Sequence, residues 1–332
     1  MRTELCDLLG IDVPIVQAAI GGAAVPELAA AVSNAGGLGT VTLTGLDGDA
    51  ALQVVRQTRE LTTGPFSAHC LLPYEGQFEE ALEVALGEKV PVVNLFWGDP
   101  APYVDRVHAA GCLLMLQLAS VEEARHAADC GVDIIVAQGF GAGGHVKGDV
   151  ALLPLVANIT KEVSSVPVLA SGGIADGRGM AAALAVGAAG AYLGTRFLAS
   201  EEASVAPEYL ERLLHAGISD TVYTTLFDHG WPDAPHRALR NSTYQTWVNS
   251  GRPPRDQRPG RDDILATDPS GYQVRRYESW TATARLEGDI EALSLWAGQG
   301  VGLVSRVQSA SDIVREINAQ AEQIIQRLAG RL

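Results

Sequence analysis

The residue with the clearest chemical potential is His145, at the end of a loop almost free of side chains. An apolar run at 134–136 is followed by glycines at 139, 141, 143 and 144, and then by His145. An imidazole exchanges a proton near neutral pH, and glycines let a planar molecule lie against the backbone. We therefore predict that His145 is a catalytic acid or base. The alternative is a structural or solvent-exposed histidine.

A second glycine pattern predicts a phosphate site. Gly172 and Gly173 stand in VLASGGIADGRG, and Gly194 and Thr195 stand in AYLGTRFLAS. Free backbone amides in such turns bind phosphate without a cationic side chain. The alternative is that these glycines only make tight turns. A dinucleotide fingerprint is not indicated, because no acidic residue closes a second strand about twenty residues later.

Cysteine and histidine spacing predicts no metal site. Cys6, Cys70, Cys112 and Cys130 are far apart, with no CxxC pair. No cluster of His, Cys and carboxylates has zinc-like spacing along the chain. We expect reduced thiols, no metal and a cytoplasmic location.

Composition narrows the partners. The 332 residues are 47% apolar and carry a net charge of −15, which argues against nucleic acid as a partner. The start of the chain lacks the apolar core of a signal peptide, and no stretch reaches the roughly 18 apolar residues of a membrane span. We expect a soluble enzyme that acts on a small molecule and does not contact a membrane. If the chain forms an oligomer, we expect a homodimer.

The chain alternates apolar runs with helical patterns. Pro26 is typical of the first turn of a helix, and the spacing of Ser120 and Glu123 is that of a capping box at the start of another helix. The apolar runs show little alternation, as in parallel strands buried on both faces. Eight such runs, spaced by roughly 20 to 27 residues, predict a (β/α)8 TIM barrel rather than an open sheet. The expected strands are 14–20, 37–43, 66–72, 91–97, 113–119, 133–139, 167–173 and 190–196.

The alternation of apolar runs and helical patterns stops between 200 and 290, where Pro, Arg and aromatic residues are frequent. We assign 1–199 plus 291–332 to the barrel, and 200–290 to an inserted lid or small subdomain after strand eight. An amphipathic pattern near the end of the chain predicts the last barrel helix. Trp231, Arg237, Tyr244 and Trp247 could line a wall for a large substrate. The alternative is a solvated lid whose aromatic residues pack among themselves.

Several motifs together resemble one family. PIVQAAIGG, VSNAGGLGTV, QGFGAGGH, PVLASGGIADGRG, AYLGTRF and AGQGVGLV occur in this order. They resemble the nitronate monooxygenases, formerly called 2-nitropropane dioxygenases, which are FMN-dependent TIM barrels. The resemblance covers almost the whole chain. FMN-dependent enoyl-ACP reductases are similar in the same motifs.

The resemblance implies a set of FMN contacts, with His145 as the catalytic histidine. Ala18, Ala19 and Ile20 would run beside the isoalloxazine, and Gln117 and Gln138 would bond to the cofactor. Gly143 and Gly144 would line its face. The phosphate would be held by Gly172, Gly173, Gly194 and Thr195, and Gly298 and Gln299 would approach from the C-terminal segment. The implied residues are Ala18, Ala19, Ile20, His69, Gln117, Gln138, Gly143, Gly144, Ser171, Gly172, Gly173, Gly194, Thr195, Gly298 and Gln299.

This chain departs from the family pattern at several positions. Gly141 replaces a glutamate that many relatives carry, so a carboxylate near the site is missing. His69 stands where an asparagine usually lies beside the flavin, Ala19 and Ile20 replace a Pro-Met pair, and Gly300 replaces a serine. These changes bear on the substrate more than on FMN binding.

The favoured function is oxidation of alkyl nitronates by O2 to a carbonyl compound and nitrite. FMN would supply the redox chemistry, and His145 would act as acid or base. One alternative is an NAD(P)H reductase of the enoyl-ACP or quinone type on the same barrel. An alternative of another class is a flavin-binding protein without turnover.

Overall fold

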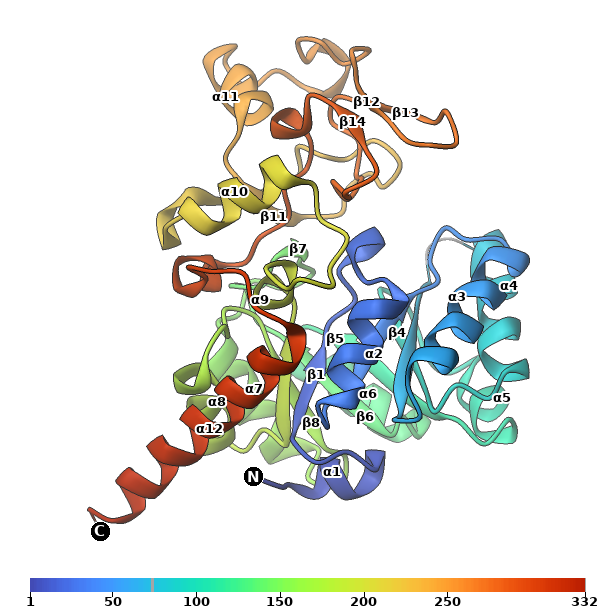
Figure 1. Ribbon diagram of the computed structural model, residues 1–332, viewed down its shortest axis with the longest axis vertical. Helices are drawn as coiled ribbons and strands as arrows, with labels where there is room; N and C mark the ends of the chain where they lie inside the picture. Colours follow the sequence, from blue (N-terminus) through green and yellow to red (C-terminus); the bar gives the residue numbers. More distant parts are fainter. Residues whose placement is uncertain (73–74, 332) are drawn as a thin grey trace.

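Eight parallel strands form the centre of the molecule (Figure 1). The computed structural model describes residues 1–72 and 75–331. The strands follow one another around the sheet in the order β1-β9-β8-β6-β5-β4-β3-β2. Their bounds are Ile15–Gln17 (β1), Gly39–Thr42 (β2), Phe66–Leu71 (β3), Val92–Phe96 (β4), Leu113–Leu118 (β5), Ile134–Gln138 (β6), Val168–Ser171 (β8) and Gly190–Leu193 (β9).

The sheet closes on itself between β1 and β2. A parallel bridge joins Val16 to Leu38. The amide of Gln17 donates to the Leu38 carbonyl at 2.9 Å, and the amide of Leu38 donates to the Ile15 carbonyl at 3.0 Å. The predicted (β/α)8 barrel is therefore confirmed, and each predicted strand run contains one of its strands.

Helices surround the barrel. They are Pro26–Asn34 (α2), Gly48–Leu61 (α3), Glu75–Gly87 (α4), Val104–Ala109 (α5), Val121–Cys130 (α6), Leu152–Glu162 (α7), Gly177–Ala185 (α8) and Ala310–Ala329 (α12). α12 packs against α8 and α2 and completes the ring (Figure 1). The Ser120 hydroxyl accepts from the Glu123 amide at 3.1 Å, and the Glu123 carboxylate accepts from the Ala119 amide at 2.9 Å. These two bonds fix the start of α6.

The barrel interior changes from apolar to polar toward the carboxyl ends of its strands. Val16, Met115 and Leu169 belong to an apolar cluster that α1 (Glu4–Leu9) covers with Leu5. Buried polar side chains stand at the carboxyl ends of several strands, since Gln17 ends β1, Gln138 ends β6 and Ser171 ends β8. The polar layer faces the end of the barrel where the loops can form a site.

Residues 200–290 cover that end of the barrel (Figure 1). The elements from the last barrel strand onward are Thr195–Leu198 (α9), Pro207–His215 (α10), Thr221–Thr224 (β10), His236–Leu239 (β11), Ser242–Asn249 (α11), Ile264–Thr267 (β12), Gln273–Arg275 (β13) and Glu287–Gly288 (β14). Short 3-10 helices lie at Gly21–Ala23 (η1), Ile218–Asp220 (η2), Arg255–Gln257 (η3), Ile290–Ala292 (η4) and Gln299–Leu303 (η5). The strands are too short for their pattern to be visible in the sequence.

The insertion contributes two small sheets. One has the order β13-β12-β14, and the other has the order β10-β11-β7. β7 is the pair Gly144–His145, so the loop that carries the predicted catalytic residue belongs to the insertion's sheet.

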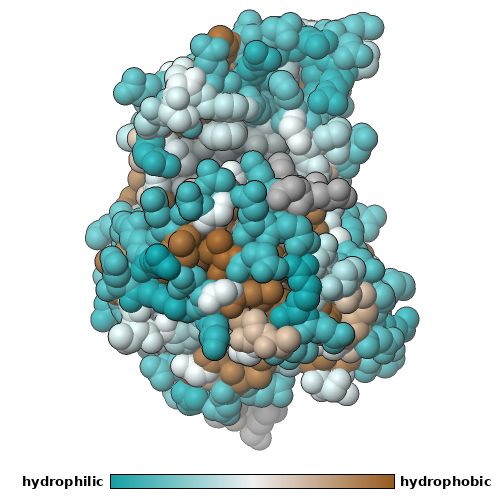
Figure 2. Space-filling view, turned by 90° about the vertical axis from the view of Figure 1, so that its right-hand side faces the viewer, coloured by the Kyte–Doolittle hydropathy of each residue, from teal (hydrophilic) through white to brown (hydrophobic). Residues whose placement is uncertain are grey.

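The insertion shares apolar packing with the barrel. One cluster joins Leu198 and Ala199 after β9 to Tyr209 and Leu239 of the insertion. The insertion is mostly hydrophilic on the surface seen in Figure 2, whereas apolar side chains gather on the barrel below it. This shared core supports the proposal that the segment is a lid and not an independent domain. Within residues 1–72 and 75–331, no helix is both long and apolar enough to cross a membrane.

Candidate active site

A cavity of about 250 Å³ lies at the carboxyl ends of the barrel strands, beneath the insertion. Among the described residues that line it, none is Lys, Arg, Asp or Glu. The cavity brings together fourteen of the sixteen residues that sequence reasoning selected. They are Ala18, Ala19, Ile20, His69, Gln117, Gln138, Gly143, Gly144, His145, Ser171, Gly172, Gly173, Gly194 and Thr195.

The other two selected residues, Gly298 and Gln299, support the wall from behind. The Gly298 amide donates to the Thr195 hydroxyl at 2.9 Å, and the Gln299 amide donates to the Gly141 carbonyl at 2.9 Å. Neither residue lines the cavity. Their backbone ties the glycine loop to the C-terminal segment.

Close packing explains why the loop before His145 has so few side chains. A Cβ on Gly143 would lie 2.4 Å from the Gly298 nitrogen and 2.6 Å from the Ala297 carbonyl carbon. Gly144 has a φ of +67°, which favours glycine. The glycines therefore let two backbone segments touch and then turn the chain so that His145 enters the cavity.

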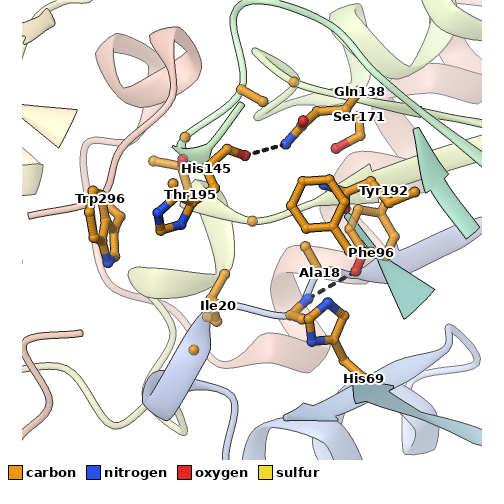
Figure 3. Close-up of a pocket in the computed structure, with 18 of the residues that line it drawn as sticks. Ala18, Ile20, His69, Phe96, Gln138, His145, Ser171, Tyr192, Thr195 and Trp296 are labelled. Atoms are coloured by element: carbon orange, nitrogen blue, oxygen red, sulfur yellow. Dashed lines mark hydrogen bonds between the residues drawn. The ribbon is translucent and has the colours of Figure 1, made fainter. Parts of the chain in front are cut away.

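Two sets of contacts fix the backbone of His145. In the β7 and β11 pair, His145 lies opposite His236. The Gln138 side-chain amide donates to the His145 carbonyl at 2.8 Å (Figure 3), and its oxygen accepts from the Lys147 amide at 3.4 Å. The resemblance implied that Gln138 bonds to the cofactor, but here its amide group bonds to the loop that carries His145. Gln138 is thus placed to position His145.

Aromatic rings enclose the His145 imidazole. The Trp231 ring lies 3.9 Å from it, centroid to centroid, and the Trp296 ring lies 5.4 Å from it. The Ser279 hydroxyl is 3.4 Å from His145 Nε2. Burial, and to a lesser extent the nearby His236, lowers the pKa of His145 well below 6.5. The imidazole is therefore neutral at neutral pH and available to accept a proton.

Glycines at the ends of β8 and β9 form a cradle of backbone amides. Gly172 and Gly173 have φ values of +117° and +73°, and a Cβ on Gly173 would meet nothing within 4 Å. Within the described chain, the amides of Gly172, Gly173 and Gly194 donate to no backbone or side-chain acceptor. Because no described residue of the cavity lining is cationic, these amides are its available partners for an anion.

A row of polar side chains with unpaired atoms lies on β2, β3 and β4. Thr42, His69 and Asn94 are neighbours in register across these strands. Thr42 Oγ1, His69 Nδ1 and Asn94 Oδ1 are buried without hydrogen-bond partners. Burial lowers the pKa of His69 to about 4, so its ring is neutral. Unpaired buried polar atoms are costly, which suggests that a bound molecule pairs with part of this row.

Sequence reasoning missed several residues that line the cavity. Phe96 and Tyr192 lie on predicted strands, and their position near the strand ends could have indicated them. The Tyr192 hydroxyl accepts from the Ala19 amide at 3.1 Å (Figure 3). Ser279 and Trp296 had no sequence signal, because the fold brings them to the cavity from outside the barrel strands.

The four residues suggested as an insertion wall are divided in the structure. Trp231 lines the cavity. Tyr244 and Trp247 pack against a cluster within the insertion, and Arg237 stacks over the Phe140 ring at 4.7 Å. These last three residues do not line the cavity.

Comparison with known proteins decides the family. The family model described as nitronate monooxygenase matches residues 2–320. The chain belongs to the nitronate monooxygenase family. It is 32% identical to a nitronate monooxygenase of Paraburkholderia phytofirmans, over 98% of this chain and 97% of the relative. The family makes the protein an oxidoreductase.

Two solved structures resemble the whole fold. FabK from Thermotoga maritima has a TM-score of 0.86 and 32% identity, with 100% of both chains covered. A nitroalkane oxidase from Streptomyces ansochromogenes has a TM-score of 0.78 and 28% identity, over 98% of this chain and 99% of that one. The recognised family resemblance is thus confirmed.

The close contact at Gly143 gives a first prediction. Gly143→Ala should lower the free energy of unfolding by about 1–3 kcal/mol, because the added methyl group overlaps backbone atoms that cannot rotate away. Gly87→Ala is the control, since a Cβ there would meet nothing within 4 Å. Urea unfolding measures both. Equal stability of the two variants would contradict the packing assigned to the glycine loop.

Proposed function

We propose that the cavity binds FMN and that the protein oxidises alkyl nitronates with O2 to a carbonyl compound and nitrite. The observation that carries this proposal is the neutral imidazole of His145 in a cavity whose described lining has no charged side chain. Such an imidazole can remove the α-proton of a neutral nitroalkane. The family and the likeness to a nitroalkane oxidase support the same substrate class.

Two features of the cavity fit FMN. The free amides at the ends of β8 and β9 suit one terminal phosphate, and the unpaired polar row on β2 to β4 suits the polar edge of a flavin ring. β1 lies between β9 and β2 in the closed barrel, so a molecule that spans both features passes Ala18 and Ala19. The absence of Lys and Arg from the described lining favours one phosphate over the two of FAD.

Bound FMN would accept electrons from the substrate and pass them to O2. His145 would accept the substrate proton or donate a hydrogen bond, depending on the form of the substrate. With a neutral nitroalkane it would act as the base, and with a preformed nitronate its N–H would donate to a nitro oxygen. Trp231 and Trp296 pack beside the imidazole, and the burial of the ring keeps it neutral. Gln138 holds the His145 backbone while the proton moves.

The second candidate is an NAD(P)H reductase of the enoyl-ACP or quinone type. The likeness to FabK over the whole chain fits it. The described cavity lining has no Lys or Arg, and its three free amides are assigned here to the FMN phosphate, so the phosphates of NAD(P)H would lack partners of their own, which favours the first candidate. A flavin-binding protein without turnover is the third candidate, and the neutral His145 in the cavity argues against it.

The cofactor proposal predicts noncovalent FMN in the purified protein. Acid should release a yellow chromophore that mass spectrometry identifies as FMN. The cradle has free amides for one phosphate and no cation for a second, which is the physical reason for this expectation. Release of FAD would overturn the assignment of the cradle.

The proton-transfer proposal predicts unequal losses in His145→Ala. Turnover of a neutral nitroalkane should fall by about 10² to 10⁴, the usual contribution of a positioned base. Turnover of the preformed nitronate should fall less, because that anion has no α-proton to lose. FMN should remain bound, since its proposed contacts lie elsewhere. His215→Ala, on the exposed face of α10, is the control and should leave both rates unchanged.

The pH profile supplies an independent check. Because the pKa of His145 lies below 6.5, kcat/KM for the nitroalkane should stay high as the pH falls through 6.5 and decline only below it. This acid limb should disappear in His145→Ala. Equal losses on both substrates, with FMN retained, would reject the base role. Loss of FMN would instead make His145 a cofactor ligand.

A further inference from the structure

Three side chains of different chemistry meet on the outside of the barrel, away from the cavity. His126 and Cys130 are four residues apart on α6, so they lie on the same face of the helix. Asp99 comes from the segment after β4, 27 residues before His126. His126 Nε2 is 2.8 Å from Asp99 Oδ1 and 3.6 Å from Cys130 Sγ. One donor atom from each residue lies within 4.8 Å of the other two.

Two of these separations can be compared with those of ligands on one tetrahedral ion, and the third, between Asp99 and Cys130, lies within 4.8 Å. With bonds of about 2.3 Å to sulfur and about 2.1 Å to nitrogen and oxygen, ligand atoms on zinc are about 3.6 Å apart for N and S, and about 3.4 Å apart for N and O. The observed N–S separation is 3.6 Å. The observed N–O separation of 2.8 Å would have to open by about 0.6 Å. Both side chains are more than half exposed and free to rotate by this amount.

The donor set selects a class of metal. A thiolate with an imidazole and one carboxylate suits Zn²⁺ or Co²⁺, whereas Ca²⁺ and Mg²⁺ prefer oxygen ligands alone. Three protein ligands leave a fourth position for water. The net charge of −15 also favours cations near the surface.

Another histidine and aspartate pair on the surface, His108 and Asp133, has no cysteine grouped with it among the described residues and serves as a comparison. His108 Nε2 lies 2.9 Å from Asp133 Oδ2, which resembles the His126 and Asp99 pair. In the described part of the chain, the group of Asp99, His126 and Cys130 is the one that brings three such donors together. A histidine and an aspartate alone form an ordinary hydrogen-bonded pair, and Cys130 completes the ligand set.

We propose that Asp99, His126 and Cys130 bind one Zn²⁺ ion per chain. The ion would tie the segment after β4 to α6. Asp99 lies two residues after Trp97, whose ring packs 5.0 Å from Trp231 in the cavity wall. The site would therefore restrain the base of that wall. It takes no part in the proposed oxidation and does not depend on it.

Chain spacing could not reveal this site. The expectation of no metal rested on the search for zinc-like clusters along the sequence. Asp99 reaches His126 only because β4 and β5 are neighbours in the barrel, which places the segment after β4 beside α6.

The test is a titration of the intact, tag-free protein with CoCl2 after removal of metals by a chelator, under anaerobic reducing conditions. One equivalent should bind, with a thiolate-to-cobalt charge-transfer band and ligand-field bands at longer wavelengths than flavin absorbs. ZnCl2 should displace it. Cys130→Ser should weaken binding by more than about 100-fold, since the loss of a mere outer-shell partner already costs 10- to 100-fold.

The matched control is His108→Asn, which breaks the similar pair that lacks a thiol. It should bind Co²⁺ as the unmodified protein does. Circular dichroism melting would verify that both variants fold, as expected for substitutions at partly exposed positions. No saturable uptake by the unmodified protein would overturn the proposal. Retained uptake in Cys130→Ser, or equal loss in His108→Asn, would also overturn it.

Discussion

The site depends on the contact between the glycine loop and the chain segments that follow the barrel. Gly143 lies against the backbone of Gly298, and the next two residues pair with β11 of the insertion. The barrel alone would present a cradle of backbone amides at β8 and β9, but it would not place an imidazole over it. The insertion alone would present tryptophans with nothing to enclose. Pairing of β7 with β11 couples the two parts, so that His145 faces the cavity between them.

The described lining of the cavity has no charged side chain, although the chain as a whole is acidic. Backbone amides are therefore the groups available to an anion, and burial keeps the histidines neutral. Burial is the first cause of the lowered pKa at both His69 and His145, and the same burial strengthens each hydrogen bond that a ligand makes there. This arrangement favours a small substrate that exchanges a proton, and it disfavours one that brings several phosphates.

Much of this could be predicted from the sequence, because the barrel strands are buried on both faces and appear as continuous apolar runs. The cradle glycines and His145 follow such strands, and strand ends in a barrel must meet. The insertion could not be predicted in the same way. Its strands have two to four residues, and the Trp296 and Ser279 side chains reach the cavity through tertiary packing alone. The role of Gln138 was also hidden, since its partner is a backbone carbonyl of the same loop.

The proposed function requires that the protein oxidises a small nitro compound and not NADH or NADPH. The most direct measurement is anaerobic rapid mixing of the yellow protein with an alkyl nitronate and, separately, with NADH and with NADPH. The nitronate should bleach the flavin absorbance within the time of one turnover, and neither dinucleotide should do so. Rapid bleaching by NADH or NADPH, with no effect of the nitronate, would contradict the proposed function and would establish the reductase instead.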